Sequence, residues 1–310
     1  MKALVTGGAG FLGSHLVDAL AAARDEVIVL DNLHRATLAN IDGHLSAKDV
    51  KFIEGDIRDY TVVRDAAAGV DVVYHLAAQS NVIGATQDAD YSFTTNVIGT
   101  YNVLKAAAST SVRRLVFASS REVYGEPESI PVPENAPFNA KNAYGASKVA
   151  GEAYCRAWQT TIGLECQILR LANVYGPRGR DRVIPIWLAR ARRGEPLELY
   201  GGDQLIDFVW VATAVEALIS AAQCELSGPI NVGSGTGVTL PHLAHRLLEA
   251  TGSLSNLRAL PARAVEVVRF VADVRQMQRV LGVTPDPEPL AHLSDCLAEY
   301  PSPALSSAAS

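Results

Sequence analysis

Val5-Thr6-Gly7-Gly8-Ala9-Gly10-Phe11-Leu12-Gly13 follows a short hydrophobic run at the start of the chain and precedes a helical pattern. Its glycines have the spacing Gly7-x-x-Gly10-x-x-Gly13. Glycine at these positions permits a tight turn, close approach of the backbone to a pyrophosphate, and close packing of the helix on the strand. Because a helix N-terminus attracts anions, the stretch predicts a dinucleotide-binding turn. The expected contacts in it are Gly7, Gly10, Phe11, Leu12 and Gly13.

Hydrophobic runs and helical patterns alternate through the first half of the chain. The runs predict buried strands at residues 4–6, 26–30, 50–53, 72–75, 115–119 and 166–171. The helical patterns between them cover residues 11–23, 62–68, 91–108 and 144–161. Such alternation is typical of a parallel sheet with helices on both faces, which binds ligands at the carboxyl ends of its strands. The expected fold class is α/β: a Rossmann-type doubly wound parallel sheet with a smaller C-terminal α/β substrate-binding lobe.

The pattern changes at residues 173–181, which contain Gly and Pro and have no periodicity. In the smaller lobe we expect a helix at 184–193, a strand pair near Leu197 and Phe208, and helices at 240–250 and 274–281. Residues 211–222 and 230–232 are expected to return to the large sheet. The predicted division is 1–172 plus about 208–232 for the dinucleotide-binding domain and 173–207 plus 233–299 for the smaller lobe. Residues 300–310 are expected to be a disordered tail.

The composition restricts the class of protein. Of the 310 residues, 48% are hydrophobic and 19% are charged, which is typical of a globular protein. The net charge is −6 and no basic run occurs, so neither nucleic acid nor a membrane is an expected partner. No stretch approaches the roughly 18 apolar residues of a membrane span, and the first strand leaves no room for a signal peptide. The scattered cysteines are expected to be reduced thiols of a cytoplasmic protein without a metal site.

Polar and small residues follow the next predicted strands. Asp31, with Asn32 beside it, ends the second strand, where a carboxylate can accept hydrogen bonds from a ribose diol and would repel a 2′-phosphate. This position favours NAD over NADP. Asp56 and Ile57 end the third strand and are candidates for contact with an adenine edge. The fourth strand ends in residues that leave room for a cofactor, Leu76-Ala77-Ala78-Gln79.

Tyr144 and Lys148 are the candidate catalytic pair. They lie one turn apart on a predicted helix, so the phenol and the ammonium share a face. A free tyrosine has a pKa of about 10, and the Lys148 cation together with the positive nicotinamide of NAD would favour the phenolate. Tyr144 could then take a proton from a sugar hydroxyl while hydride leaves the same carbon. Ser120 would bind the same oxygen, and Glu122 is either a second acid/base or an acceptor for a substrate hydroxyl.

Together these motifs resemble the extended short-chain dehydrogenase/reductase family, in its nucleotide-sugar epimerase/dehydratase branch. The resemblance extends to about residue 282. It rests on the segments above and on Val123-Tyr124-Gly125, Tyr144-Gly145-Ala146-Ser147-Lys148 and Arg170-Leu171-Ala172-Asn173-Val174-Tyr175-Gly176-Pro177. It implies a catalytic triad of Ser120, Tyr144 and Lys148, a tightly bound and recycled NAD, and a nucleotide-diphosphate sugar as substrate.

The resemblance also assigns the remaining site residues. The expected cofactor contacts beyond the glycine turn are Asp31, Asn32, Asp56, Ile57, Leu76, Ala77, Ala78, Gln79, Asn96, Ser119, Tyr144 and Lys148. The expected substrate contacts are Ser80, Ser120, Glu122, Tyr144, Asn173, Val183, Tyr200, Arg263 and Glu266. A homodimer joined by helices 91–108 and 144–161 in a four-helix bundle is implied as well. Alanines suit such close helix packing at Ala106, Ala107, Ala108, Ala150 and Ala157.

Three departures from the family pattern bear on the reaction. Ile206 stands where many relatives have a phosphate-binding arginine, a role that Arg178, Arg180, Arg182 or Arg263 could take over. Arg121 stands where sugar 4,6-dehydratases place an Asp general acid, and a guanidinium is a poor proton donor at neutral pH. Gln79-Ser80-Asn81 stands where uronate decarboxylases have Pro-Ala-Ser-Pro.

These departures favour an NAD-dependent nucleotide-diphosphate-sugar 4-epimerase that acts on a UDP-sugar through a transient 4-keto intermediate. Glu122 is shared with dehydratases and decarboxylases, so a lyase remains open: a nucleotide-sugar 4,6-dehydratase or a UDP-uronate decarboxylase. A third interpretation is a non-catalytic NAD-sensing or interaction protein on the same scaffold, which the intact triad disfavours.

Overall fold

A computed structural model describes residues 1–299, and the predicted tail at 300–310 lies outside the described residues. The large sheet has seven parallel strands. In spatial order they are β10 (Ile230–Val232), β6 (Glu165–Leu171), β5 (Arg114–Ser120), β4 (Val72–His75), β1 (Lys2–Thr6), β2 (Glu26–Asp31) and β3 (Val50–Glu54). The order reverses at β1, and such a reversal is where doubly wound sheets bind ligands. The predicted Rossmann-type α/β class is confirmed.

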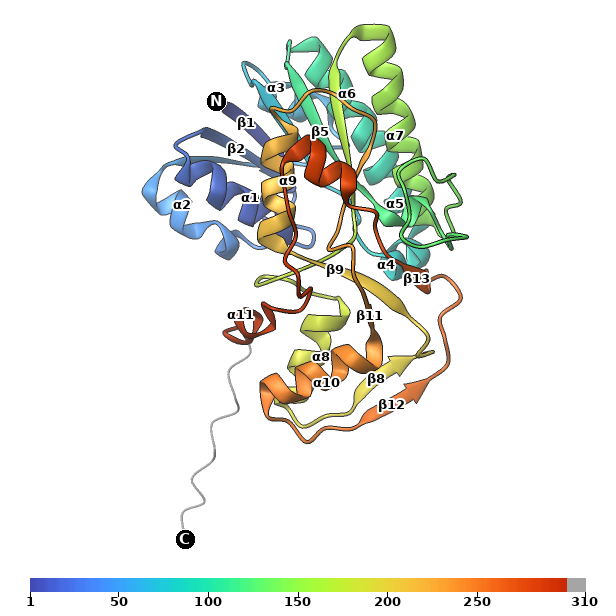
Figure 1. The fold of residues 1–310 in the computed structure, drawn as a ribbon. Coiled ribbons are helices and arrows are strands. Elements are labelled where there is room, and N and C mark those ends of the chain that lie inside the picture. Colours follow the sequence, from blue (N-terminus) through green and yellow to red (C-terminus); the bar gives the residue numbers. More distant parts are fainter. Residues whose placement is uncertain (300–310) are drawn as a thin grey trace.

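Helices cover both faces of this sheet (Figure 1). On one face lie α1 (Phe11–Ala22) and α9 (Val211–Ala221), and on the other lie α3 (Tyr60–Ala66), α6 (Thr100–Ser109) and α7 (Ala143–Ile162). The shorter helices are α2 (Asp42–Ala47), α4 (Val82–Gln87) and α5 (Ala89–Phe93). Because both faces are covered, the central strands β1, β2 and β4 are nearly continuous hydrophobic runs, as expected for a buried parallel sheet.

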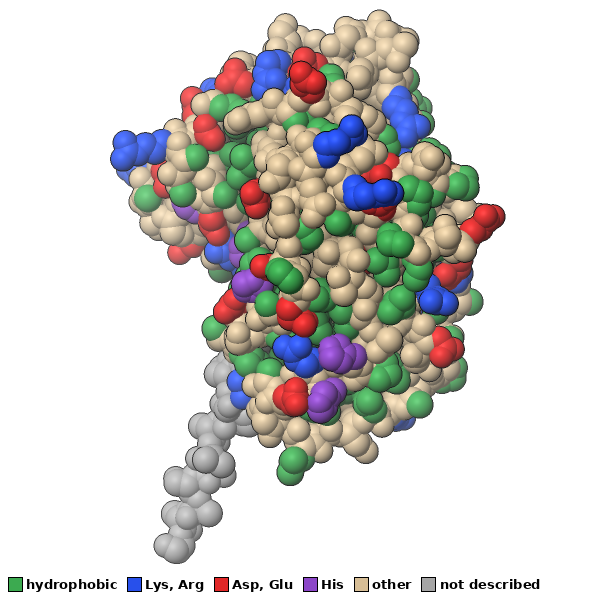
Figure 2. Space-filling model, viewed as in Figure 1, with side chains coloured by type: hydrophobic (Ala, Val, Ile, Leu, Met, Phe, Trp, Pro, Cys, Tyr) green, Lys and Arg blue, Asp and Glu red, His purple; other side chains and the backbone are tan. Residues whose placement is uncertain are grey.

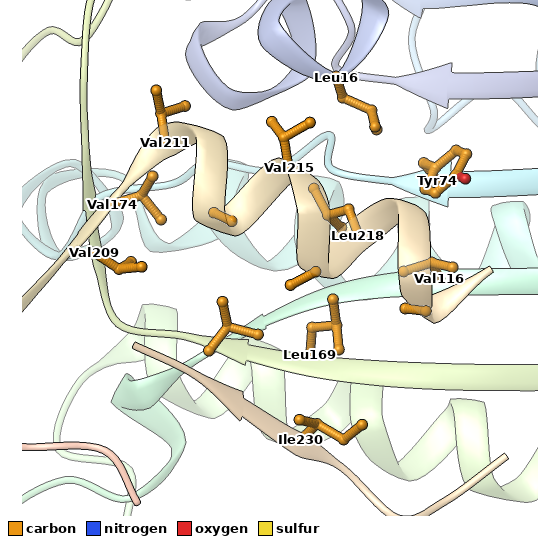
Figure 3. Close-up of a cluster of buried hydrophobic side chains, with 14 of the residues drawn as sticks. Leu16, Tyr74, Val116, Leu169, Val174, Val209, Val211, Val215, Leu218 and Ile230 are labelled. Atoms are coloured by element: carbon orange, nitrogen blue, oxygen red, sulfur yellow. The ribbon is translucent and has the colours of Figure 1, made fainter. Parts of the chain in front are cut away.

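The core between the sheet and its α1–α9 face is closely packed. Val215 of α9 points toward α1, which carries Leu16, while Val116 and Leu169 lie on the strands at the other side of the helix (Figure 3). These side chains are almost fully buried. Each such burial contributes about 1.5–3 kcal/mol of hydrophobic free energy, so this layer holds the strand ends that form the site at fixed positions.

The predicted helix 91–108 is wrong in one respect, because it is not a continuous α-helix. Between α5 and α6 the residues Thr94–Gly99 form a π-helical segment. In this segment Asn96 turns its side chain inward to the Gln79 backbone, and the Thr100 hydroxyl donates to the Asn96 carbonyl oxygen at 2.6 Å. π-Helical turns are frequent at functional sites, and this one lies behind the fourth strand of the predicted cofactor site.

The smaller lobe contains two separate sheets. β9 (Leu205–Trp210) pairs with β7 (Asn173–Tyr175), β11 (Gly237–Thr239) and β13 (Arg269–Phe270), whereas β8 (Leu197–Tyr200) pairs with β12 (Leu257–Leu260). The predicted pairing of strands near Leu197 and Phe208 is therefore wrong. Gly201 and Gly202 separate them with φ of +82° and +125°, a conformation that L side chains rarely adopt, and the turn carries β9 away from β8.

Three helices complete the smaller lobe, α8 (Val183–Arg192), α10 (Leu240–Thr251) and α11 (Leu293–Leu297). The predicted helix 274–281 is instead a π-helical turn, Met277–Leu281, packed on α9 and β10 of the large sheet. Its assignment to the smaller lobe is thus not reproduced. On the face shown in Figure 2, acidic and basic side chains are interspersed. Within residues 1–299, no helix combines the length and apolarity needed to cross a membrane.

Candidate active site

One cleft of about 670 Å³ runs from the glycine turn to the smaller lobe. It opens at the carboxyl ends of β1, β4 and β5, where the strand order reverses. Its walls contain almost every residue that the sequence assigned to the cofactor or the substrate. Open parallel sheets bind their ligands at this place.

The glycine turn is built for close approach to a ligand. Gly7 has φ of +75°, and a Cβ there would lie 2.8 Å from the backbone nitrogen of Ala77. A Cβ on Gly13 would lie 2.1 Å from the Gly7 carbonyl oxygen. Gly10 caps α1 without a side-chain hydrogen bond, so the first N–H groups of the helix have no such partner. Gly7, Gly10 and Phe11–Gly13 all line the cleft, and this bare helix N-terminus fits the pyrophosphate of a dinucleotide.

Asp31 lines the cleft beside this turn. Its carboxylate accepts hydrogen bonds from the backbone nitrogens of Ala9 at 3.1 Å and Leu33 at 2.9 Å. Burial raises the pKa of Asp31, and these two hydrogen bonds lower it in part. Each carboxylate oxygen has a second lone pair, so Asp31 retains acceptor capacity toward the cleft. Asn32 lines the cleft next to it.

Asp56 is placed differently from the expectation. Its carboxylate accepts from Arg58 Nη2 at 2.7 Å and from Asn32 Nδ2 at 2.8 Å. Burial opposes ionisation, but the hydrogen bonds from Arg58 and Asn32 prevail and lower the pKa of Asp56 to about 2. Gly55 and Ile57 line the cleft, whereas the Asp56 side chain is occupied by Arg58.

The residues expected to contact the cofactor after β4 have two different positions. The wall of the cleft contains Leu76, Ala77 and Ala78, whereas Gln79 and Asn96 lie buried behind it. Asn96 Oδ1 accepts from the Gln79 nitrogen at 2.8 Å, and Asn96 Nδ2 donates to Ser147 Oγ at 2.9 Å. Asn96 therefore connects the end of the fourth strand to α7, so it acts by positioning other residues.

Tyr144, Ser120 and Lys148 meet in the middle of the cleft. Tyr144 and Lys148 lie on the first two turns of α7, and Ser120 ends β5. The Ser120 hydroxyl faces Tyr144 and lowers the pKa of its phenol. Burial raises the pKa of Tyr144, while the Arg182 cation and the Ser120 hydrogen bond lower it in part.

Lys148 supports the phenol differently from the sequence expectation. Its Nζ donates to the Ala118 carbonyl oxygen at 2.8 Å and lies 5.8 Å from the centroid of the Tyr144 ring. Burial lowers the pKa of Lys148 to about 8. The cations that lower the pKa of Tyr144 are instead Arg182 and Arg121, which line the same cleft. A signal for Arg182 was present in the sequence, because three arginines fall in residues 178–182.

Sequence reasoning missed a buried charged network behind the triad. Ser119 Oγ donates to Glu152 Oε1 at 2.6 Å, and Arg170 donates to both oxygens of Glu152 at 2.9 and 2.8 Å. Glu152 follows Tyr144 and Lys148 at helical spacing on the same face of α7, which was the available signal. Ser119 lines the cleft, but its hydroxyl is committed to Glu152.

Glu122 lies beside Ser120, and each of its carboxylate oxygens has a partner. Oε1 forms an ion pair with Arg121 Nη2 at 3.0 Å, and Oε2 accepts from Asn142 Nδ2 at 2.8 Å. Glu122 is 4% exposed. Arg121 packs over the Phe270 ring. Glu122 is thus a bound carboxylate at the wall of the cleft.

The smaller lobe supplies the opposite wall. The expected substrate residues Ser80, Asn173, Val183, Tyr200, Arg263 and Glu266 all line the cleft. The Arg263 guanidinium lies 3.6 Å from the centroid of the Tyr200 ring and 3.0 Å from Glu266 Oε1. Ile206 also lines the cleft.

The four candidate replacements for the arginine missing at Ile206 differ in their partners. Arg178 pairs with Asp18 at 2.7 Å, and Arg263 pairs with Glu266. Arg182 Nη2 donates to the Ser80 carbonyl oxygen at 3.2 Å and, within residues 1–299, forms no ion pair. Arg180 is an exposed residue of the cleft wall. Arg180 and Arg182 thus leave positive charge available for an anionic ligand.

Comparison with known proteins agrees with this geometry. Residues 3–233 match the NAD dependent epimerase/dehydratase family. A putative UDP-glucose 4-epimerase of Methanocaldococcus jannaschii is 35% identical over 290 residues, covering 91% of this chain and 93% of that protein. The crystal structure of a Thermotoga maritima UDP-glucose 4-epimerase with UDP-glucose superposes with a TM-score of 0.91 at 31% identity, covering 96% of this chain and 98% of that one.

A dehydratase is equally similar. The dTDP-glucose 4,6-dehydratase DesIV of Streptomyces venezuelae, with NAD and TYD bound, superposes with a TM-score of 0.91 at 33% identity, covering 97% of this chain and 98% of that one. The similarity therefore gives the family and its NAD cofactor without separating the two reactions. The chain belongs to the NAD-dependent epimerase/dehydratase family, the nucleotide-sugar branch of the extended short-chain dehydrogenases/reductases, and is an NAD-dependent enzyme.

Proposed function

We propose that this enzyme is a 4-epimerase of a nucleotide-diphosphate sugar, with a UDP-sugar as the preferred substrate. One observation carries the proposal. The Ser120–Tyr144 hydroxyl pair is in place, whereas the side chains that a lyase would recruit beside it, at positions 121 and 122, bind each other. An epimerase needs only the hydroxyl pair and the cofactor, while a lyase also needs a free proton donor or acceptor.

The residues of the cleft have distinct roles in the proposed reaction. NAD, held by the glycine turn and Asp31, would supply a reversible hydride acceptor for the sugar C4, so that epimerisation through a 4-keto sugar needs no other redox partner. Tyr144, whose pKa burial raises and the Arg182 cation lowers in part, takes the proton of the C4 hydroxyl and later gives it back. Ser120 donates to the same oxygen while its charge changes. Lys148, fixed to Ala118, holds a positive charge beneath the Tyr144 ring.

A lyase is the second candidate, and Glu122 is the observation that favours it. This carboxylate lies at the cleft wall next to Ser120, where it could act as acid or base in the loss of water or CO₂. Mass spectrometry and NMR of products from UDP-, dTDP- and GDP-sugars separate the candidates. Epimerisation conserves mass and inverts C4, whereas a product lighter by water or CO₂ would replace the epimerase proposal with the lyase.

Removal of the Tyr144 hydroxyl tests the proposed acid/base. In Tyr144→Phe we expect turnover to fall by about 10²- to 10⁴-fold, the usual contribution of a positioned proton-transfer group. NAD content should stay unchanged, because the glycine turn and Asp31 are intact. Tyr154→Phe, on the exposed face of the same helix, is the control. Near-normal turnover by Tyr144→Phe would contradict the mechanism.

We further propose that the enzyme is a homodimer joined through α5–α7 in a four-helix bundle. Four large hydrophobic side chains of these helices are exposed, Phe93, Ile98, Tyr154 and Ile162. Tyr154 contacts Tyr101 and Trp158 in an aromatic cluster between α6 and α7. Two of the alanines expected at such an interface, Ala106 and Ala107, lie in the core of the monomer instead, so the aromatic side chains are the better basis for it.

A further inference from the structure

Asn142, the residue before α7, joins three parts of the active site. Its Oδ1 accepts from the Gly145 nitrogen at 2.8 Å and so caps the helix. Its Nδ2 donates to Glu122 Oε2 at 2.8 Å and to the Val265 carbonyl oxygen at 3.1 Å. A cap needs only the acceptor oxygen. The two donor contacts of the Asn142 amide therefore serve something other than the capping of α7.

The Glu122 contact reaches the catalytic hydroxyls. The Glu122 nitrogen donates to Ser120 Oγ at 3.2 Å. A Cβ on Gly145 would lie 2.5 Å from the Glu122 carbonyl oxygen, so this turn rests directly on the first turn of α7. Tyr144 lies in that first turn and lines the same cleft as Ser120, whose hydroxyl lowers the pKa of the phenol. A displacement of Asn142 would therefore change how Ser120 and Tyr144 face each other.

The Val265 contact reaches the opposite wall of the cleft. We call residues 261–268 the substrate loop, because Arg263, Glu266 and Val267 from this segment line the cleft. Lys141, next to Asn142, also holds the loop, since its Nζ donates to the Glu266 carbonyl oxygen at 2.7 Å. The start of α7 is thus attached to the substrate loop by two consecutive side chains.

We propose that Asn142 is a positioning residue that makes the alignment of Tyr144 with Ser120 depend on occupation of the substrate loop. Glu122 serves this linkage as the acceptor of the Asn142 amide rather than as a proton donor or acceptor in the reaction. The inference rests on the proposed function insofar as the loop is taken to bind the nucleotide diphosphate. The linkage lets a correctly seated nucleotide orient the phenol, and misplacement of a reacting group by about 1 Å can cost about 10²-fold in rate.

Asn142→Ser separates linkage from capping. Serine keeps an acceptor for the helix N-terminus but has no amide donors for Glu122 and Val265. We expect an unchanged melting temperature, a kcat lower by about 10- to 100-fold, and a KM changed far less than kcat. Glu122→Gln keeps an acceptor oxygen for Asn142, so its kcat should fall less than that of Asn142→Ser. Asn135→Ala, an exposed residue of the preceding segment, is the matched control and should behave like wild type.

A binding readout independent of turnover completes the test. With UDP as the probe, hydrogen exchange of the first turn of α7 should slow in the wild type and not in Asn142→Ser. UDP that binds the wild type without slowing this exchange overturns the linkage, even where epimerisation is observed. A loss of kcat in Glu122→Gln larger than in Asn142→Ser would also overturn it, because Glu122 would then act in proton transfer. UDP-dependent protection in an enzyme that yields a lighter product would instead preserve the linkage and refute the 4-epimerase.

Discussion

At the scale of single residues, burial decides the charge of Lys148. In the folded protein its pKa is about 8, whereas its ordinary value is 10.5. Between these two values the unfolded chain holds a proton that the folded protein has released, so raising the pH favours folding. Relative to Lys148→Met, the wild-type free energy of unfolding should rise by about 3 kcal/mol from pH 8 to 10.5. Below pH 8 the difference should stay constant, because both states are protonated.

Urea unfolding of both proteins at several pH values checks this. Four tyrosines with raised pKa values, Tyr74, Tyr124, Tyr144 and Tyr175, weaken folding at the alkaline end, but they are common to both proteins and cancel in the difference. Two stability curves that run parallel through this range would show that Lys148 keeps its ordinary pKa in the fold.

Single residues also show what the sequence could predict of the site. Spacing along one helix was enough to expect Tyr144 and Lys148 in the same cleft, where the structure places them. Spacing could not show which cation acts on the phenol. Arg182 comes from a loop far along the chain, and only the packing of the smaller lobe against the large sheet brings it toward Tyr144. Long-range electrostatics of this kind has no local sequence signal.

At the scale of elements, the junction of β1 and α1 tests the glycine argument. In Gly13→Ala the new Cβ would lie 2.1 Å from the Gly7 carbonyl oxygen. The atoms that this Cβ would contact belong to the backbone, which cannot move aside as the end of a flexible side chain can. We therefore expect the free energy of unfolding to fall by about 3 kcal/mol and bound NAD to be lost. Gly43→Ala in α2 meets no atom within 4 Å and should stabilise the protein by about 0.5–1 kcal/mol.

Urea unfolding and the NAD content of the purified variants measure both effects. If Gly13→Ala retained NAD and wild-type stability, close packing at the turn would not be the reason for glycine there.

The sequence predicted the strands of the large sheet better than it predicted β12 or the π-helical segment. The central strands β1, β2 and β4 are nearly continuous hydrophobic runs, a strong signal that needs no knowledge of neighbours. β12 was not predicted, because Leu257–Leu260 is largely exposed and shows no alternation. Its pairing with β8 depends on a partner far along the chain. The π-helical segment inside 91–108 was also invisible, since its cause is the tertiary contact between Asn96 and Gln79.

At the scale of the whole molecule, the active site exists only where the two lobes meet. The large sheet supplies the glycine turn and the Ser120–Tyr144 pair, and the smaller lobe supplies Arg182 and the substrate loop. After the first strands of the smaller lobe the chain comes back to the large sheet, where α9 packs on one face and β10 pairs with β6. The two lobes are therefore joined by several crossings of the chain rather than by one linker, which fixes the cleft between them.

The proposed homodimer is the last property that belongs to the whole molecule. Phe93 and Ile98 are 54% and 42% exposed on α5 and the π-helical segment, and a bundle of α5–α7 from two copies would bury them. Phe93→Asp with Ile98→Asp would place unpaired charges in that interface, each at a cost of about 3–5 kcal/mol. Light scattering after size exclusion should then show the mass of one chain instead of two. Leu254→Asp changes a fully exposed leucine of the smaller lobe and should leave the dimer intact. A wild-type protein that runs as a monomer at micromolar concentration would refute the bundle, and a dimer unaffected by the double variant would place the interface elsewhere.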